Sequence, residues 1–220
     1  DSVSGVSIVW VKSVGGMGRV CSGQVGRRVL MGLLLPGALW LGLGAPLHAA
    51  TLEGQAFDDT VALSGRSLRL NGLGLRGVAW IKAFVAGLYL PTVTQEEDRA
   101  IAMPGPKRLR LKVMLHAPSR ELTRSLLGRV QRHEPADLVD RLRPGLDELG
   151  ARLDSLGELA PGDTLDLDFL PGQGLSLRYN GKAVGSVLAS DELYPAVLRI
   201  FVGGHPVDAL LKQGLMRGGT

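Results

Sequence analysis

The side chain best placed to do chemistry in this chain is Arg76, which comes directly before a long apolar stretch. A charge at the mouth of a segment that continues into a core is poorly placed for simple solvation. A guanidinium presents a planar fork of N–H donors, so Arg76 could cap a pocket and hold the anionic or phenolic end of a ligand. The alternative interpretation is an ordinary arginine at the rim of the fold.

Two carboxylates, Asp166 and Asp168, lie two residues apart in an alternating segment and therefore share one face of a strand. Paired carboxylates can carry out acid–base chemistry. A solvated strand face explains the same spacing without any catalysis, and this is the interpretation that we favour.

The sequence lacks the stronger signatures of catalysis: it has no G-x-S-x-G nucleophile turn, no phosphate-binding loop and no H-E-x-x-H pair. The stretch 72–77 has the wrong glycine spacing for dinucleotide binding. Downstream of residue 50, His116, His133 and His205 are far apart in the sequence. We therefore expect no metal site and no cofactor.

Residues 26–50 have the three parts of a secretory signal peptide: a positively charged start, an apolar run over 29–43, and small residues before a polar stretch. The apolar run is shorter than the roughly 20 residues that a membrane-spanning helix needs, which argues against a membrane anchor. We expect cleavage beside Ala49 or Ala50 and export to a bacterial periplasm, with no stable membrane span in the mature protein.

Residues 1–25 precede this signal, and they indicate either a recorded start upstream of the true one or a disordered extension. By length, residues 51–220 form one domain.

The single cysteine, Cys21, lies before the signal, so thiol catalysis, disulfides and cysteine zinc sites are excluded for the mature form. From residue 51 onward, 21 Lys and Arg balance 20 Asp and Glu, which gives no support to a nucleic-acid partner. The oligomeric state is left open.

Alternating and helical hydrophobic patterns predict the elements that must position these side chains. In chain order we expect a hairpin over 51–70, a central strand in the second half of 71–90, a helix capped by Thr94, a strand over 107–113, a helix capped by Ser119, a helix over 136–156, a meander of strands over 165–169, 175–179 and 182–187, a helix opened by Ser190 and a helix over 206–215. Within 107–113 the alternation directs Arg108, Arg110 and Lys112 outward. The order predicts an α+β fold, an antiparallel sheet with helices gathered on one face.

The segment Gly72-Leu-Gly-Leu-Arg76, followed by 81–90, resembles the G-x-G-x-R…K-F-x-x-x-G-[VL]-Y-L segment of the chalcone isomerase family. The later order fits as well, with a helix pair, an Asn180-Gly-Lys hairpin, and a helix leading to Phe-Val-Gly-Gly-His-Pro-Val. The chain is most similar to exported bacterial chalcone isomerase-like proteins over 51–215. The resemblance implies an open-faced β-sandwich, with helices packed on a large sheet and a cleft between them.

The resemblance also implies where the catalytic side chains of the plant enzymes would fall. Their cleft arginine matches Arg76, and their strand threonine falls at Phe84. Their tyrosine and lysine fall near Leu122 and Ser125, and their asparagine near Arg129. These departures remove the groups that would stabilise a phenolate or enolate, so stereospecific chalcone cyclisation is not expected.

What remains is an apolar cleft with one cationic end, which is typical of a binding protein. Non-catalytic plant relatives of this fold bind fatty acids, so we expect a small hydrophobic or amphipathic ligand. The expected ligand-binding residues are Arg76, Phe84, Met114, Leu122, Ser125 and Leu126. Two alternatives stay open: an intramolecular lyase or isomerase that acts on another substrate, and an interaction module whose cleft is filled by its own side chains. A connected cavity of about 300 Å³ or more would favour a ligand.

Overall fold

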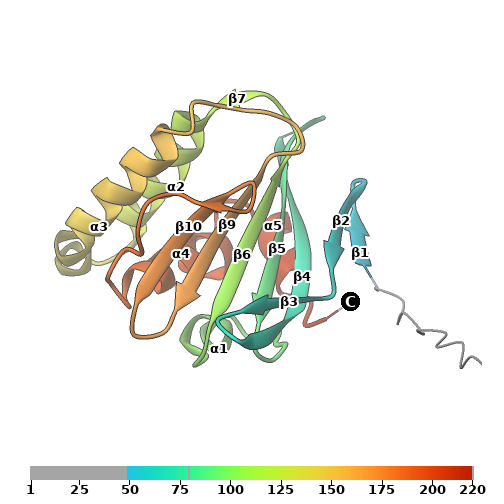
Figure 1. The fold of residues 1–220 in the computed structure, drawn as a ribbon, viewed down its shortest axis with the longest axis horizontal. Helices are drawn as coiled ribbons and strands as arrows, with labels where there is room; N and C mark the ends of the chain where they lie inside the picture. The colour runs from blue at the N-terminus through green and yellow to red at the C-terminus, as the bar shows by residue number, and fades with distance from the viewer. Residues whose placement is uncertain (1–48, 79, 220) are drawn as a thin grey trace, which may run out of the picture. The chain divides into compact units, whose positions relative to one another are not determined.

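The computed structural model describes residues 49–78 and 80–219 (Figure 1). The predictions made for residues 1–48, including most of the signal peptide, lie outside this range. The centre is a seven-stranded antiparallel sheet in the order β11-β10-β9-β6-β5-β4-β3. Its strands are β3 (Thr60–Leu63), β4 (Arg66–Val78), β5 (Ile81–Leu90), β6 (Lys107–Val113), β9 (Thr164–Leu170), β10 (Gly174–Tyr179) and β11 (Lys182–Ala183).

Two short strand pairs and five helices complete the described chain. β1 (Ala49–Leu52) and β2 (Gln55–Asp58) form a hairpin, and β7 (Ala117–Pro118) pairs with the distant β8 (Glu158–Leu159). The helices are α1 (Glu97–Ala102), α2 (Ser119–His133), α3 (Ala136–Asp154), α4 (Leu193–Val202) and α5 (Ala209–Leu215). In the described residues, no helix is both long enough and apolar enough to cross a membrane.

The central strand predicted in the second half of 71–90 is confirmed as β5, and the first half, for which we predicted no strand, is the end of β4. Strand β4 continues to Val78, which pairs with Ile81, so only two residues connect the strands. Glycine is depleted in strands, so Gly72 and Gly74 gave no strand signal in the first half. Their role in the strand becomes visible only with the helix that packs on them.

The predicted hairpin turns are confirmed. Ser64 and Gly65 have φ of 49° and 73°, and Asn180 and Gly181 have φ of 47° and 78°. Two successive positive φ values define the tight turn whose twist matches that of antiparallel strands. The strand after Asn180 is shorter than predicted, since β11 ends at Ala183.

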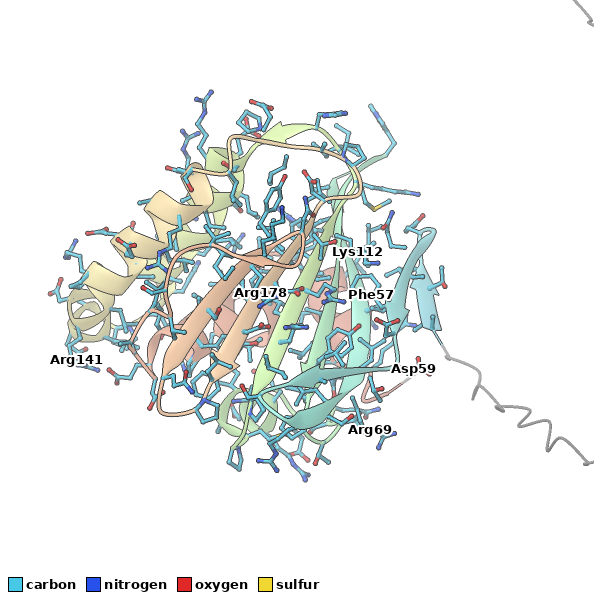
Figure 2. All side chains as sticks on the ribbon, in the orientation of Figure 1. Phe57, Asp59, Arg69, Lys112, Arg141 and Arg178 are labelled. Carbon is cyan, nitrogen blue, oxygen red and sulfur yellow. The ribbon has the colours of Figure 1, made fainter. Side chains whose placement is uncertain are left out.

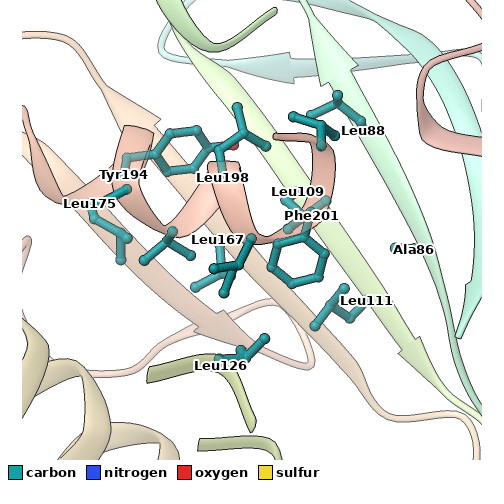
Figure 3. Packing of buried hydrophobic residues seen from close by; sticks show 14 of the residues in the cluster. Ala86, Leu88, Leu109, Leu111, Leu126, Leu167, Leu175, Tyr194, Leu198 and Phe201 are labelled. Carbon is teal, nitrogen blue, oxygen red and sulfur yellow. The ribbon is translucent and has the colours of Figure 1, made fainter. Parts of the chain in front are cut away.

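The helices gather on one face of the sheet, as predicted, and α4 and α5 lie behind it in Figure 1. The main core lies between helices and sheet, and Figure 3 shows Leu126 of α2, Tyr194, Leu198 and Phe201 of α4 and Leu109 of β6 within it.

Two predicted helix caps are corrected. Pro118 occupies the cap position of α2 with extended backbone, and the Ser119 hydroxyl instead donates to the carbonyl of Asp154. Helix α1 begins at Glu97, and the Thr94 hydroxyl accepts from the Glu96 amide before it.

The sheet is curled, and its second face carries a smaller apolar cluster. This cluster contains Phe57, Val61, Leu68, Leu70, Leu73, Val85 and Tyr89. The ammonium of Lys112 lies 4.9 Å from the centre of the Phe57 ring, and Figure 2 shows the two side chains together in front of the sheet. Both faces therefore exclude water near the middle of the sheet.

Candidate functional site

The glycines of β4 bring helix α5 unusually close to the sheet. A Cβ atom at Gly72 would lie 2.2 Å from the carbonyl oxygen of Gly214, and a Cβ at Gly74 would lie 2.2 Å from that of Leu211. The absence of side chains at these positions therefore sets the distance between strand and helix. Arg76, the next residue on this face, meets the start of the same helix.

The guanidinium of Arg76 is anchored at that helix start. Its Nη1 donates to the carbonyl of Val207 at 3.0 Å and to the carboxylate of Asp208 at 3.1 Å. Asp208 is also the cap of α5, since its other oxygen accepts from the Leu211 amide at 3.0 Å. A guanidinium has five N–H donors. The two on Nη1 serve these contacts, which leaves three that have no partner among the described residues.

A pocket of about 260 Å³ opens beside Arg76, between the sheet and α2. Four of the six expected ligand-binding residues line it together: Arg76, Phe84, Leu122 and Ser125. Leu126 lies in the main core and is not part of the lining. Met114 packs against the smaller cluster on the opposite face, because it continues the alternation of β6, in which Arg108, Arg110 and Lys112 face away from the main core. The expected contact of these two residues with the ligand is not supported by their positions.

The lining is apolar apart from Arg76, Glu121 and Ser125. Phe84 and Leu122 supply no hydroxyl. Arg129 points elsewhere, since its Nη1 donates to the carbonyl of Pro206 at 3.0 Å. The described pocket thus has one cation, one carboxylate and one hydroxyl around a hydrocarbon interior.

Sequence reasoning missed several lining residues. Glu121 lies one turn before Ser125 on α2, and this spacing of four could have identified it. Ala117, Pro118 and Leu159 come from the β7–β8 pair, which joins segments about 40 residues apart in the sequence. No local pattern predicted that pairing.

The opposite face of the sheet holds a ladder of buried ion pairs, which overturns the prediction of a solvated strand face. Arg108 binds Asp168 through two hydrogen bonds of 2.6 and 2.7 Å, and Arg110 binds Asp166 through two of 2.7 and 2.9 Å. Both aspartates are 2% exposed. Strands β6 and β9 are adjacent with these residues in register, so the outward charges pair across the sheet instead of facing water.

Burial and pairing act in opposite directions on the charged groups of β6. Burial disfavours the charged form of Arg108, but the hydrogen bond and charge of Asp168 outweigh it and raise the pKa of Arg108. Lys107 has no carboxylate partner among the described residues. Its ammonium donates to the carbonyl of Ile101 and lies over the Phe169 ring, and burial lowers its pKa to about 8.

The fold brings together two histidines that are distant in sequence. The rings of His133 and His205 stack with centroids 4.8 Å apart. Within the described residues, however, no group of three or more histidine, cysteine, aspartate or glutamate side chains could hold a metal ion.

Comparison with known proteins agrees with this architecture. A family model described as chalcone isomerase-like matches residues 49–217. Among the solved structures that match, a fatty-acid binding protein of Arabidopsis thaliana superposes with a TM-score of 0.60 and 20% sequence identity, covering 77% of this chain and 96% of the plant protein. This likeness concerns the fold. A search of the curated proteins found no match.

Proposed function

The chain belongs to the chalcone isomerase-like family, and we propose that it is a non-catalytic member that binds a small amphipathic ligand such as a fatty acid. The ligand's hydrocarbon part would occupy the pocket between the sheet and α2. Its carboxylate would lie at the three N–H donors of Arg76 that serve no described contact.

The observation that carries the proposal is the chemical contrast within one pocket. Leu111, Val113 and Leu165 contribute hydrocarbon to its wall, while Arg76 provides a cation at one end. Positions that would hold catalytic hydroxyls by resemblance are Phe84 and Leu122. The matched plant structure is described as a fatty-acid binding protein, which makes the same ligand class a reasonable one for this chain.

The size of the pocket sets a limit on the ligand. Its volume of about 260 Å³ is slightly below the 300 Å³ at which small-molecule pockets usually begin. A short acyl chain fits within it, whereas a long chain must leave part of its length outside or displace side chains such as Leu122. We therefore expect fatty acids of about eight to twelve carbons to bind more tightly, per carbon, than longer ones.

The decisive experiment compares two variants that should change ligand affinity in opposite directions, one by removing the Arg76 cation and the other by removing its partner charge at Asp208. Arg76→Gln removes the cation and should weaken binding of decanoate at least tenfold. Asp208→Asn keeps an effective helix cap but removes the competing charge, so it should tighten binding. Affinities would be measured by calorimetry, with native mass spectrometry of the purified protein to detect acids that co-purify.

The methyl ester of decanoate serves as the control ligand because it lacks the carboxylate. Its affinity should be the same for the original protein and both variants. Leu122→Trp, which fills the pocket, should abolish binding of acid and ester alike. If decanoate binds equally to the original protein and Arg76→Gln, the assignment of the carboxylate to Arg76 is wrong. If no acid binds, the interaction module with a filled cleft becomes the better account.

A catalytic function is the second candidate, and the position of Glu121 favours it. This carboxylate and Arg76 line the same pocket, so a base and a cationic stabiliser could act on one substrate. Turnover of a substrate other than a chalcone that Glu121→Gln abolishes, with binding of decanoate unchanged, would support an intramolecular lyase over the binding protein.

The site of action is a separate proposal. We propose export to a periplasm after cleavage beside Ala49 or Ala50, on the sequence pattern alone. Expression of the full coding sequence, fractionation of the cells and N-terminal sequencing of the product would test it. An uncleaved protein that stays in the cytosol would refute it.

A further inference from the structure

Exposed apolar side chains gather at the end of the molecule where β4 ends, β5 begins and the pocket opens. In the described residues, three large hydrophobic side chains are exposed: Trp80 at 86%, Ile81 at 54% and Leu210 at 75%. Trp80 and Ile81 lie at the β4–β5 turn, two to three residues from Ala83 of the pocket wall. Single exposed hydrophobic residues are common on protein surfaces, but these three share one end of the fold.

Helix α5 places Leu210 at this same end. The carbonyl of Leu211 lies against Gly74, and Asp208 binds Arg76 near the end of β4. The start of α5 therefore lies beside the last residues of β4, toward the turn that carries Trp80. Figure 1 shows the end of β4 and the start of β5 at the same end of the sheet as β7, whose residues also line the pocket.

The other side of the pocket is basic. Helix α2 contains four arginines and one glutamate. Arg120, Arg124 and Arg132 recur at multiples of four residues, so they lie on one face, and none of them forms an ion pair with a described residue. Arg124 and Arg132 line a shallow groove that shares Glu121 and Ser125 with the pocket. Apolar and basic surfaces thus flank one opening.

We propose that this end of the protein docks on a lipid bilayer that contains anionic phospholipids. Trp80 and Ile81 enter the interfacial region, where tryptophan is favoured because one end of its ring system is apolar and the other is polar. The arginines of α2 lie against the lipid phosphates. The mouth of the pocket then faces the membrane, and a poorly soluble ligand can pass between bilayer and pocket without crossing water. The docking itself does not depend on which ligand the pocket holds.

The test uses the fluorescence of Trp80, since the other tryptophans, Trp10 and Trp40, can be replaced by phenylalanine. The protein, purified from cells that express the full coding sequence, is mixed with vesicles of phosphatidylcholine, with or without phosphatidylglycerol. We expect the emission of Trp80 to shift to the blue and to be quenched by brominated phospholipid in the anionic vesicles. The readout is local, so lipid binding by any other segment does not imitate it.

Matched charge variants test the basic surface. Arg124→Gln with Arg132→Gln should raise the lipid concentration needed for half of the blue shift by roughly 30-fold at low salt, since each arginine near an anionic surface contributes about fivefold. Arg141→Gln with Arg143→Gln removes the same charge from α3, where both side chains are paired, and should have little effect.

Three results would overturn the proposal. The first is an emission of Trp80 that stays unchanged with anionic vesicles. The second is a blue shift that appears without lipid and grows with protein concentration. Trp80, Ile81 and Leu210 would then form a contact between copies of the chain. The third is an equal response to neutral and anionic vesicles that the α2 variants do not alter.

Discussion

Replacing Asp168 by asparagine removes one charge from the buried ladder on the second face of the sheet. Arg108 then loses two hydrogen bonds of 2.6 and 2.7 Å. Its nearest remaining carboxylate is Asp166, whose Oδ2 lies 3.6 Å from Arg108 Nε and which is already paired with Arg110. Two largely buried arginines would then share one carboxylate.

Removing one partner from a buried ion pair costs about 3–5 kcal/mol, because the other charge remains buried without compensation. With a urea dependence of about 2 kcal/mol per molar for a domain of this size, the unfolding midpoint should fall by about 1.5–2.5 M. Urea unfolding followed by circular dichroism measures this shift directly.

Two further variants separate charge burial from other effects of the substitution. Arg108→Met combined with Asp168→Leu removes both charges and should recover most of the lost stability, since an apolar pair of similar volume is often as stable as a buried ion pair. Asp137→Asn breaks an exposed pair with Arg141 on α3 and should leave the midpoint unchanged. If Asp168→Asn behaves like Asp137→Asn, the ladder is solvated and the reasoning fails.

Three other substitutions give separable outcomes. Because burial lowers the pKa of Lys107 from 10.5 to about 8, the unfolded chain binds more protons than the folded one between these pH values. The free energy of unfolding should therefore rise by about 3 kcal/mol over that range, and Lys107→Met should remove the rise in urea titrations at successive pH values. Gly74→Ala should lower the free energy of unfolding by about 3 kcal/mol in thermal melts, because its Cβ would lie 2.2 Å from the backbone oxygen of Leu211. Gly204→Ala, which has open space around it, should leave the melting temperature nearly unchanged. Asn180→Ala should cost about 1–2 kcal/mol in urea unfolding, because it places alanine at φ of 47° and removes the hydrogen bond to the Thr164 amide.

The local patterns of the sequence determined most of the elements and their arrangement. Asn180-Gly181 predicted its hairpin because few residues tolerate two successive positive φ values. The leucines of α3 predicted a helix with one apolar face, and the alternation in β6 predicted a strand with Leu109 and Leu111 toward the core. These features depend on neighbours within one turn or one hairpin, so the sequence contains the information they need.

The candidate site could be predicted in part for the same reason. Arg76, Phe84, Leu122 and Ser125 were selected by their correspondence to a known motif, and the structure gathers them around one pocket. Met114 was assigned to the wrong face, since the alternation of β6, continued one residue past Val113, directs its side chain away from the pocket. Asp208, the partner of Arg76, is 132 residues away and could not be identified from any local pattern.

The tertiary structure alone decided which charges meet and which surfaces exclude water. In sequence, Arg108, Arg110, Asp166 and Asp168 have the alternation of a strand with one wet face. The adjacency of β6 and β9 and the curl of the sheet convert that face into a buried ladder. Periodicity specifies the side of a strand on which a residue lies, whereas burial and ion pairing depend on contacts between segments that are distant in the chain.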